Sequence, residues 1–238
     1  ALLDEMLEAS VTPFSWAGAY ESYLTGSQYE LWCDYEGKEQ MQLNYSFDGV
    51  AKDLVDTVAP NGTYTLLPEQ TITNNNAYML QKQAGKLKAL KFIKRLTANS
   101  NYYTTGSAGS SSNNAAQLEF IQNTLNGKPI AFLSEGTWWE QEAAAVFDSI
   151  SQKFIGKNRK TLRYGLLPMP KANASKVGED RTIVCLNDTS MFINKRVEGE
   201  AKEGLVKLFY QFCQSDEILK LFNKETGMTR AFDYTLNS

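Results

Sequence analysis

The chain has 238 residues, a formal net charge of −3 and a hydrophobic fraction of 42%. This composition excludes disorder of the whole chain, and the lack of a basic surplus argues against a nucleic-acid partner. Histidine is absent, which removes the commonest general base, the commonest neutral metal ligand and the usual partner of a nucleophilic Ser or Cys. The cysteines, Cys33, Cys185 and Cys213, are widely spaced and form no CxxC motif. We therefore expect free thiols, no metal site and no cofactor.

The first third of the chain begins with a helix and a strand. An apolar stripe in residues 2–7 predicts an amphipathic helix, with neither an initiator Met nor a cap before it. This start leads us to expect a chain cut from a longer protein. A β-strand is predicted over 11–16, and a Tyr-rich helix from about 20 to 33. Residues 34–75 are polar and poorly periodic, so we expect short helices and loops there.

The middle of the chain predicts helices on either side of a polar loop. Residues 76–98 have apolar positions three and four apart, which lie on one face of a helix. Their many lysines indicate a solvated face, with a basic binding surface as the alternative. Residues 104–114 are rich in Ser, Gly and Asn and predict a flexible surface loop. A further helix, over 118–125, ends at Gly127, a residue typical of the position after a helix.

Strands and helices alternate in the second half. The sequence predicts strands over 130–133, 163–169, 182–186 and 189–194, and helices over 137–154, over 201–212 and from Ser215 to Gly227. This alternation predicts an α/β layered fold.

The stretch from Glu135 to Trp139 carries the most chemical information. It follows a predicted strand, and ligands of α/β proteins lie beyond the carboxyl ends of strands. Thr137 and Glu140 have the spacing of a capping box, which places Trp138 and Trp139 in the first helical turn. Successive helical side chains diverge by about 100°, so both indoles cannot face the core. An exposed indole beside a carboxylate suits a sugar, because the ring packs on C–H groups and the carboxylate accepts hydroxyl hydrogens. Packing of two half-buried indoles is the alternative.

Two further groups of residues are candidates for a binding site. Trp16, Tyr20 and Tyr23 follow the first strand, and the two tyrosines lie one helical turn apart. They predict an aromatic wall, with core packing as the alternative. Asp188 lies between two predicted strands and offers a short hydrogen-bonding side chain, with a plain turn as the alternative. Glu135 with Glu140 or Glu142 would form a pair of carboxylates, so a glycoside hydrolase remains an alternative function.

The order of these motifs resembles the extracellular solute-binding proteins of ABC sugar importers, the family that includes maltose-binding protein. The stretches that carry the resemblance are Thr12–Trp16, Lys88–Lys94, Asn126–Leu133, Gly136–Trp138, Gly165–Pro170, Phe192–Lys195, Phe209–Glu217 and Gly227. The resemblance implies a periplasmic-binding-protein type II-like fold with two α/β lobes and hinge strands. Residues 1–183 correspond to the second, C-terminal lobe, and residues 184–238 to a hinge strand and helices that return toward a first lobe whose start is missing.

The resemblance also implies a function. The chain is expected to bind a mono- or oligosaccharide in a cleft between the lobes, without enzymatic activity, and to deliver it to the transmembrane subunits of an ABC permease. Trp138 matches the sugar-stacking Trp of the family's Gly-x-Trp stretch, and Trp16, Tyr20 and Tyr23 match its cleft aromatics. The expected location is extracytoplasmic, in the periplasm or as a cell-surface lipoprotein, with membrane attachment only through a missing N-terminal lipid anchor. None of the cysteines present is the anchor residue. The alternatives are a carboxylate-only glycoside hydrolase and a ligand-sensing domain on the same fold.

Overall fold

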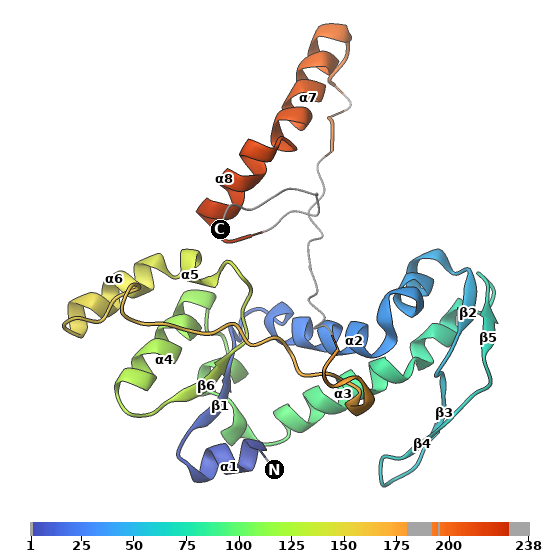
Figure 1. The fold of residues 1–238 in the computed structure, drawn as a ribbon, viewed down its shortest axis with the longest axis horizontal. Helices are drawn as coiled ribbons and strands as arrows, with labels where there is room; N and C mark the ends of the chain where they lie inside the picture. The colour runs from blue at the N-terminus through green and yellow to red at the C-terminus, as the bar shows by residue number, and fades with distance from the viewer. Residues whose placement is uncertain (1, 180–191, 195, 229–238) are drawn as a thin grey trace. The chain divides into compact units, whose positions relative to one another are not determined.

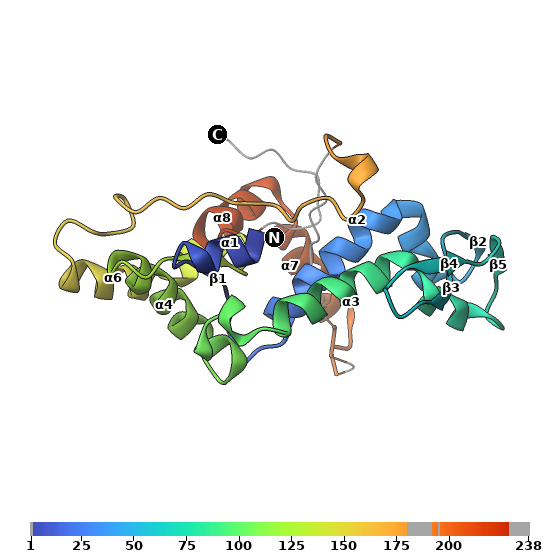
Figure 2. The same cartoon turned by 90° about the horizontal axis from the view of Figure 1, so that it is seen from below.

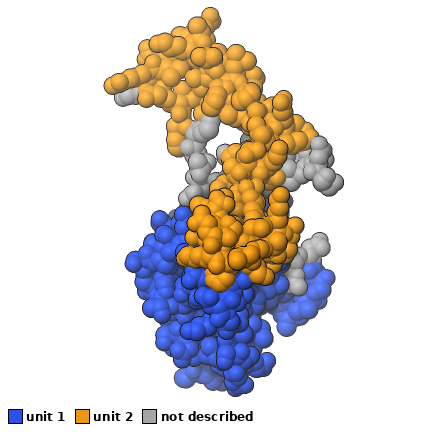
Figure 3. Space-filling model, turned by 90° about the vertical axis from the view of Figure 1, so that its left-hand side faces the viewer, with its two compact units in different colours: residues 1–134, 164–186 blue, residues 135–163, 187–238 orange. Residues whose placement is uncertain are grey.

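The computed structural model describes residues 2–179, 192–194 and 196–228 (Figure 1). The chain forms two compact units, which Figure 3 shows in different colours. Unit 1 comprises residues 1–134 and 164–186, and unit 2 comprises residues 135–163 and 187–238. The division from the sequence, 1–183 and 184–238, concerns lobes of a larger protein and stays a prediction. Among the described residues the structure is mixed α/β, with more helix than strand and with small sheets.

Unit 1 contains a two-stranded parallel sheet. Strand β1 (Thr12–Ser15) pairs with β6 (Ile130–Leu133), with Phe14 opposite Phe132. The sequence predicts both strands but not their pairing. Tyr103 forms an isolated parallel bridge with Phe14. Helix α1 (Leu2–Glu8) precedes β1, and α4 (Asn113–Leu125) precedes β6. Gly127 follows α4 in the left-handed conformation, which confirms the predicted stop.

Helix α2 (Ser22–Ser46) is longer than predicted, because it continues past Cys33. Gly37 interrupts its helical geometry with φ 76° and ψ 173°, a conformation that glycine adopts without a Cβ penalty. Helix α3 (Ala84–Thr97) packs along α2, and both views show the two helices side by side (Figures 1 and 2). Ala89 and Leu96 are buried in this helix, which confirms the predicted apolar face.

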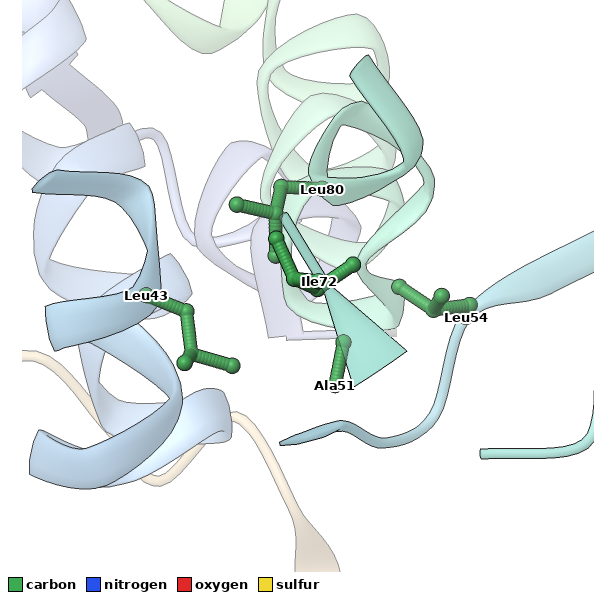
Figure 4. Packing of buried hydrophobic residues seen from close by; sticks show 5 residues of the cluster. All are labelled: Leu43, Ala51, Leu54, Ile72 and Leu80. Atoms are coloured by element: carbon green, nitrogen blue, oxygen red, sulfur yellow. The ribbon is translucent and has the colours of Figure 1, made fainter. Parts of the chain in front are cut away.

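Short strands follow α2, where the sequence predicts only short helices and loops. Strand β2 (Gly49–Ala51) pairs antiparallel with β5 (Gln70–Ile72), and β3 (Val55–Val58) pairs antiparallel with β4 (Tyr64–Leu66). The prediction was wrong because these strands are only three or four residues long and bury few positions, so no alternation is visible. Ala51 of β2 and Ile72 of β5 form one buried cluster with Leu54, which precedes β3, and with Leu43 and Leu80 of the flanking helical segments (Figure 4).

The helix predicted over 76–98 is divided by Gln83. A 3₁₀ helix, Ala77–Lys82, precedes it and α3 follows it, while Gln83 itself is extended at φ −52° and ψ 131°. Its buried side chain accepts hydrogen bonds from Trp32 Nε1 (3.2 Å) and Asn44 Nδ2 (3.0 Å), and donates to the carbonyl of Gln40 (3.0 Å). Because these partners belong to α2, the break depends on tertiary contacts that periodicity does not reveal.

Residues 164–179 belong to unit 1 and are irregular apart from a 3₁₀ turn, Ala174–Lys176. The described residues 163–169 do not form the predicted strand. Lys171 forms an ion pair with Asp34 of α2 at 2.8 Å, and both side chains are only 5% exposed. The second carboxylate oxygen of Asp34 accepts the N–H of Ala172 at 2.8 Å. These contacts fasten the segment to α2. The strand predicted over 182–186 lies outside the described residues, and so does most of 189–194, whose described part, 192–194, contains no strand.

Unit 2 contains α5 (Trp139–Glu142), α6 (Ala144–Lys153), α7 (Glu200–Cys213) and α8 (Asp216–Thr226). The helix predicted over 137–154 is broken at Ala143, and the predicted capping box is wrong, because Trp138 is the cap residue and no side chain caps the helix. The predicted inner face of α6 is confirmed, since Val146, Phe147 and Ile150 are buried. Gly227 ends α8 in the left-handed conformation, as predicted.

Candidate functional site

The carboxyl end of β1 is enclosed by the segment predicted as a flexible loop. This segment instead contains a 3₁₀ turn, Thr105–Ala108, and buries Thr104 and Ser107. Ser107 Oγ accepts the N–H of Trp16 (2.9 Å) and donates to its carbonyl (3.1 Å). The N–H of Gly18 donates to Ser111 Oγ (3.1 Å), and a Cβ at this glycine would overlap the carbonyl oxygens of the loop. The composition misled the prediction because hydroxyl groups that suit a solvated loop here satisfy buried backbone groups.

Trp16 and Tyr23 lie in a core cluster of unit 1. Trp16 is only 5% exposed and packs with Leu96 and Tyr102, while its ring centroid lies 5.0 Å from that of Tyr103. Tyr23 is half-buried against the same cluster. Their positions agree with the alternative of core packing, and the buried indole of Trp16 offers no accessible face for stacking.

Tyr20 differs from its neighbours because it is 50% exposed. Its ring centroid lies 6.3 Å from that of Tyr23, at an interplanar angle of 48°. The predicted pair therefore forms, one ring at the surface and the other against the core. Of the three aromatic residues predicted after β1, Tyr20 is the most exposed.

The chain that leaves β6 is fixed before it reaches Glu135. The N–H of Ser134 donates to the carbonyl of Ser15 (2.9 Å), and Ser134 Oγ donates to the carbonyl of Tyr23 (2.6 Å). The next residue, Glu135, begins unit 2 and is half-buried. Its Oε2 accepts the N–H of Gly136 at 3.3 Å, which turns the carboxylate toward its own backbone.

Gly136 and Trp138 form a close contact within one turn. A Cβ built on Gly136 would overlap three atoms of the six-membered ring of Trp138. The indole therefore lies over the glycine, at the place where any other residue would carry a side chain. The Gly-x-Trp spacing has a steric reason here, because only glycine leaves room for this position of the ring.

Both adjacent indoles are half-buried, so neither lies fully in the interior or fully in solvent. The centroid of the Trp139 ring lies 5.9 Å from that of Phe147, with an interplanar angle of 45°. Trp139 thus packs on α6, whereas Trp138 packs on its own turn. The two rings point to different surroundings, as their divergence by about 100° on a helix requires.

Glu140 is engaged by a cation rather than by a helix cap. Its Oε2 lies 3.5 Å from Arg159 Nε, and Arg159 Nη1 donates to Gln141 Oε1 at 3.0 Å. Gln141 Nε2 donates to the carbonyl of Lys224 at 3.1 Å. Side chains of α5 therefore connect residues 154–163 with the end of α8 inside unit 2.

Unit 1 also contains a set of partly and fully buried charged groups that was not predicted from the sequence. Asp34 and Lys171 belong to this set, and so does Glu36. Burial raises the pKa of Glu36 to about 7, although the N–H of Gly85 donates to this carboxylate at 2.7 Å. Burial also raises the pKa of Glu30, which lies near Asp34. Nothing in the local sequence marks these residues, since their partners are distant along the chain.

Asp188 lies outside the described residues. Within the described part of the chain, no group of three or more His, Cys, Asp and Glu side chains could hold a metal ion, and no helix is long and apolar enough to cross a membrane. A cavity of 260 Å³ beside α7 is lined by Phe192, Val206, Phe209 and their neighbours, and it includes none of the predicted site residues. Comparison with known protein families, curated proteins and solved structures yields no match to the chain.

Proposed function

We propose that this chain is the substrate-binding component of an ABC importer and binds a mono- or oligosaccharide without converting it. One observation carries the proposal: the Trp138 indole is held over Gly136 beside Glu135, in the turn that follows strand β6. This combination of a preset indole and an adjacent carboxylate matches the chemistry of a pyranose ring.

The indole suits a sugar for a physical reason. A pyranose has an apolar face of C–H groups, which packs on an aromatic plane, and a rim of hydroxyl groups, which donate to carboxylate oxygens. Trp138 is half-buried, so part of its surface remains accessible while the rest is held by the turn. Because the ring is already positioned, binding costs little side-chain entropy. A stacked ring contributes about 1–3 kcal/mol, by analogy with bases on aromatic side chains.

The fold that the proposal assigns is the periplasmic-binding-protein type II-like fold with two lobes. The parallel pairing of β1 and β6, and the position of the Gly-x-Trp turn after β6, support this assignment. In this scheme, the sugar contacts both lobes and stabilises the closed form, which the permease subunits recognise. The location would be extracytoplasmic, in the periplasm or at the cell surface through a lipid anchor.

A binding assay with an indole variant tests the proposal. We would screen the full gene product against a panel of sugars by thermal shift, and then measure the affinity of the best sugar by calorimetry for the parent and for Trp138→Ala. We expect at least several-fold weaker binding with little change in thermal stability. Tyr78→Ala, which removes an exposed aromatic ring of unit 1, is the control and should bind as the parent does.

Two outcomes would contradict the proposal. Unchanged affinity in Trp138→Ala would remove the role of the indole. Hydrolysis of the sugar during the incubation, detected by chromatography of the recovered ligand, would favour a glycoside hydrolase over a transport protein.

A further inference from the structure

The C-terminal end of α8 lies against the backbone of the Gly-x-Trp turn, within unit 2. Gly227 ends this helix with φ 73° and ψ −2°, and its N–H donates to the carbonyl of Asn223 at 2.8 Å. A Cβ on Gly227 would lie 2.7 Å from the carbonyl oxygen of Thr137 and 3.1 Å from the Cα of Trp138. Both atoms belong to the backbone, so no side chain can rotate away to make room. The approach therefore requires glycine for space as well as for its positive φ.

A side-chain link ties the same two segments together. Gln141 Nε2 donates to the carbonyl of Lys224, one of the terminal carbonyls of α8 that have no partner within the helix. Arg159 holds the other end of the amide by donating to Gln141 Oε1. The end of α8 is thus joined to the Gly-x-Trp turn by the close approach at Gly227, and to α5 by the hydrogen bond of Gln141.

The position of the Trp138 ring depends on the backbone that α8 supports. The ring lies over Gly136, two residues before it, so the contact is set by the backbone between these residues. Thr137, whose carbonyl faces Gly227, is the residue between them. A shift of this peptide changes the direction of the Cα–Cβ bond of Trp138, and with it the position of the indole.

We propose that the end of α8 positions the Trp138 indole, and that Gly227 is the positioning residue at this contact. The inference rests on the proposed function, in which Trp138 is the stacking surface for a sugar. It adds that α8 determines the geometry of the site, although this helix begins more than 75 residues after Trp138.

The test replaces with alanine two glycines that have nearly the same positive φ. Gly227→Ala places a methyl group against Thr137 and Trp138, whereas Gly156→Ala, also in unit 2 and with φ 75°, places a methyl group where no atom lies within 4 Å. The strain of a positive φ is common to both variants, so a difference between them reports the contact. The signal of Trp138 is isolated as the near-UV circular dichroism difference between each variant and the same variant with Trp138→Phe.

We expect Gly227→Ala to change this difference spectrum and to weaken sugar binding about fivefold or more, since part of the stacking contribution is lost. Gly156→Ala should leave both unchanged. Gln141→Leu removes the hydrogen bond to the carbonyl of Lys224 without backbone strain, and it should alter the spectrum in the same direction. This variant replaces Gly227→Ala in the test if Gly227→Ala does not fold. A difference spectrum that is the same in the parent, Gly227→Ala and Gln141→Leu would overturn the inference. Absence of sugar binding in the parent would instead count against the proposed function, because the spectrum requires no sugar.

Discussion

Substitutions in the buried ion pair between Asp34 and Lys171 test how strongly this pair holds residues 164–179 to α2. The two charged atoms are 2.8 Å apart, and each side chain is 5% exposed, so water screens the pair little. Asp34→Ala leaves the ammonium group of Lys171 buried without this carboxylate, and it also removes the acceptor of the Ala172 N–H. Breaking one side of a buried pair costs about 3–5 kcal/mol, and we expect a loss in this range.

The double variant Asp34→Ala/Lys171→Met separates the cost of an uncompensated charge from the value of the pair. The double variant removes both charges of the pair, and apolar replacement of a buried pair is often neutral or stabilising. We therefore expect the double variant to be more stable than Asp34→Ala alone. The difference between the double variant and the sum of the single variants gives the coupling energy of the pair.

Urea denaturation followed by far-UV circular dichroism measures the free energies of unfolding, and amide hydrogen exchange at Ala172 gives a local measure. Asp34→Asn, which keeps the size of the side chain, replaces Asp34→Ala if that protein does not fold. The reasoning would be refuted if Asp34→Ala lowers the free energy of unfolding by less than about 1 kcal/mol and leaves the Ala172 amide as protected from exchange as in the parent. Breaking a buried ion pair costs more than this. Additive single variants would show that the two charges do not interact.

Three further changes have expected outcomes. Gly136→Ala should displace the Trp138 ring, shift its fluorescence and weaken sugar binding about tenfold, whereas Gly165→Ala, with open space around its Cβ, should not. Ser107→Ala removes the buried acceptor of the Trp16 N–H and should cost about 1–3 kcal/mol in urea denaturation, a loss that the exposed Ser110→Ala should not reproduce. Glu36 has a folded-state pKa of about 7, above its ordinary 4.5, so it binds more protons when folded and its contribution to stability is lost as the pH rises from 4.5 through 7. Glu36→Gln should flatten this part of the pH profile of the urea midpoint, and a parallel profile would show that another group titrates.

Local signals in the sequence determined several elements correctly. Strand β6 is a short apolar run between Gly127 and the Gly-x-Trp turn, and it lies where predicted. The ends of α4 and α8 at Gly127 and Gly227 follow from the tolerance of glycine for positive φ, which is a property of the residue itself. The buried face of α6 follows from helical spacing alone.

Tertiary contacts decided the features that local patterns could not give. Gln83 divides a periodic helix because its amide is bound by residues of α2, about 40 to 50 residues earlier. The strands between 49 and 72 are too short and too exposed to alternate visibly. The indole of Trp16 is buried because it packs with Leu96 and Tyr102, which lie far along the chain.

The candidate site shows the same division. The sequence by itself placed two indoles and a carboxylate after a strand, because the order of residues along the chain fixes which side chains share a turn. It could not show that Trp138 lies over Gly136, or that Gly227 supports the turn from a distant helix. The position of a side chain depends on which segments pack against its backbone, and those segments meet only in the folded protein. The pairing of Asp34 with Lys171, 137 residues apart, has the same cause.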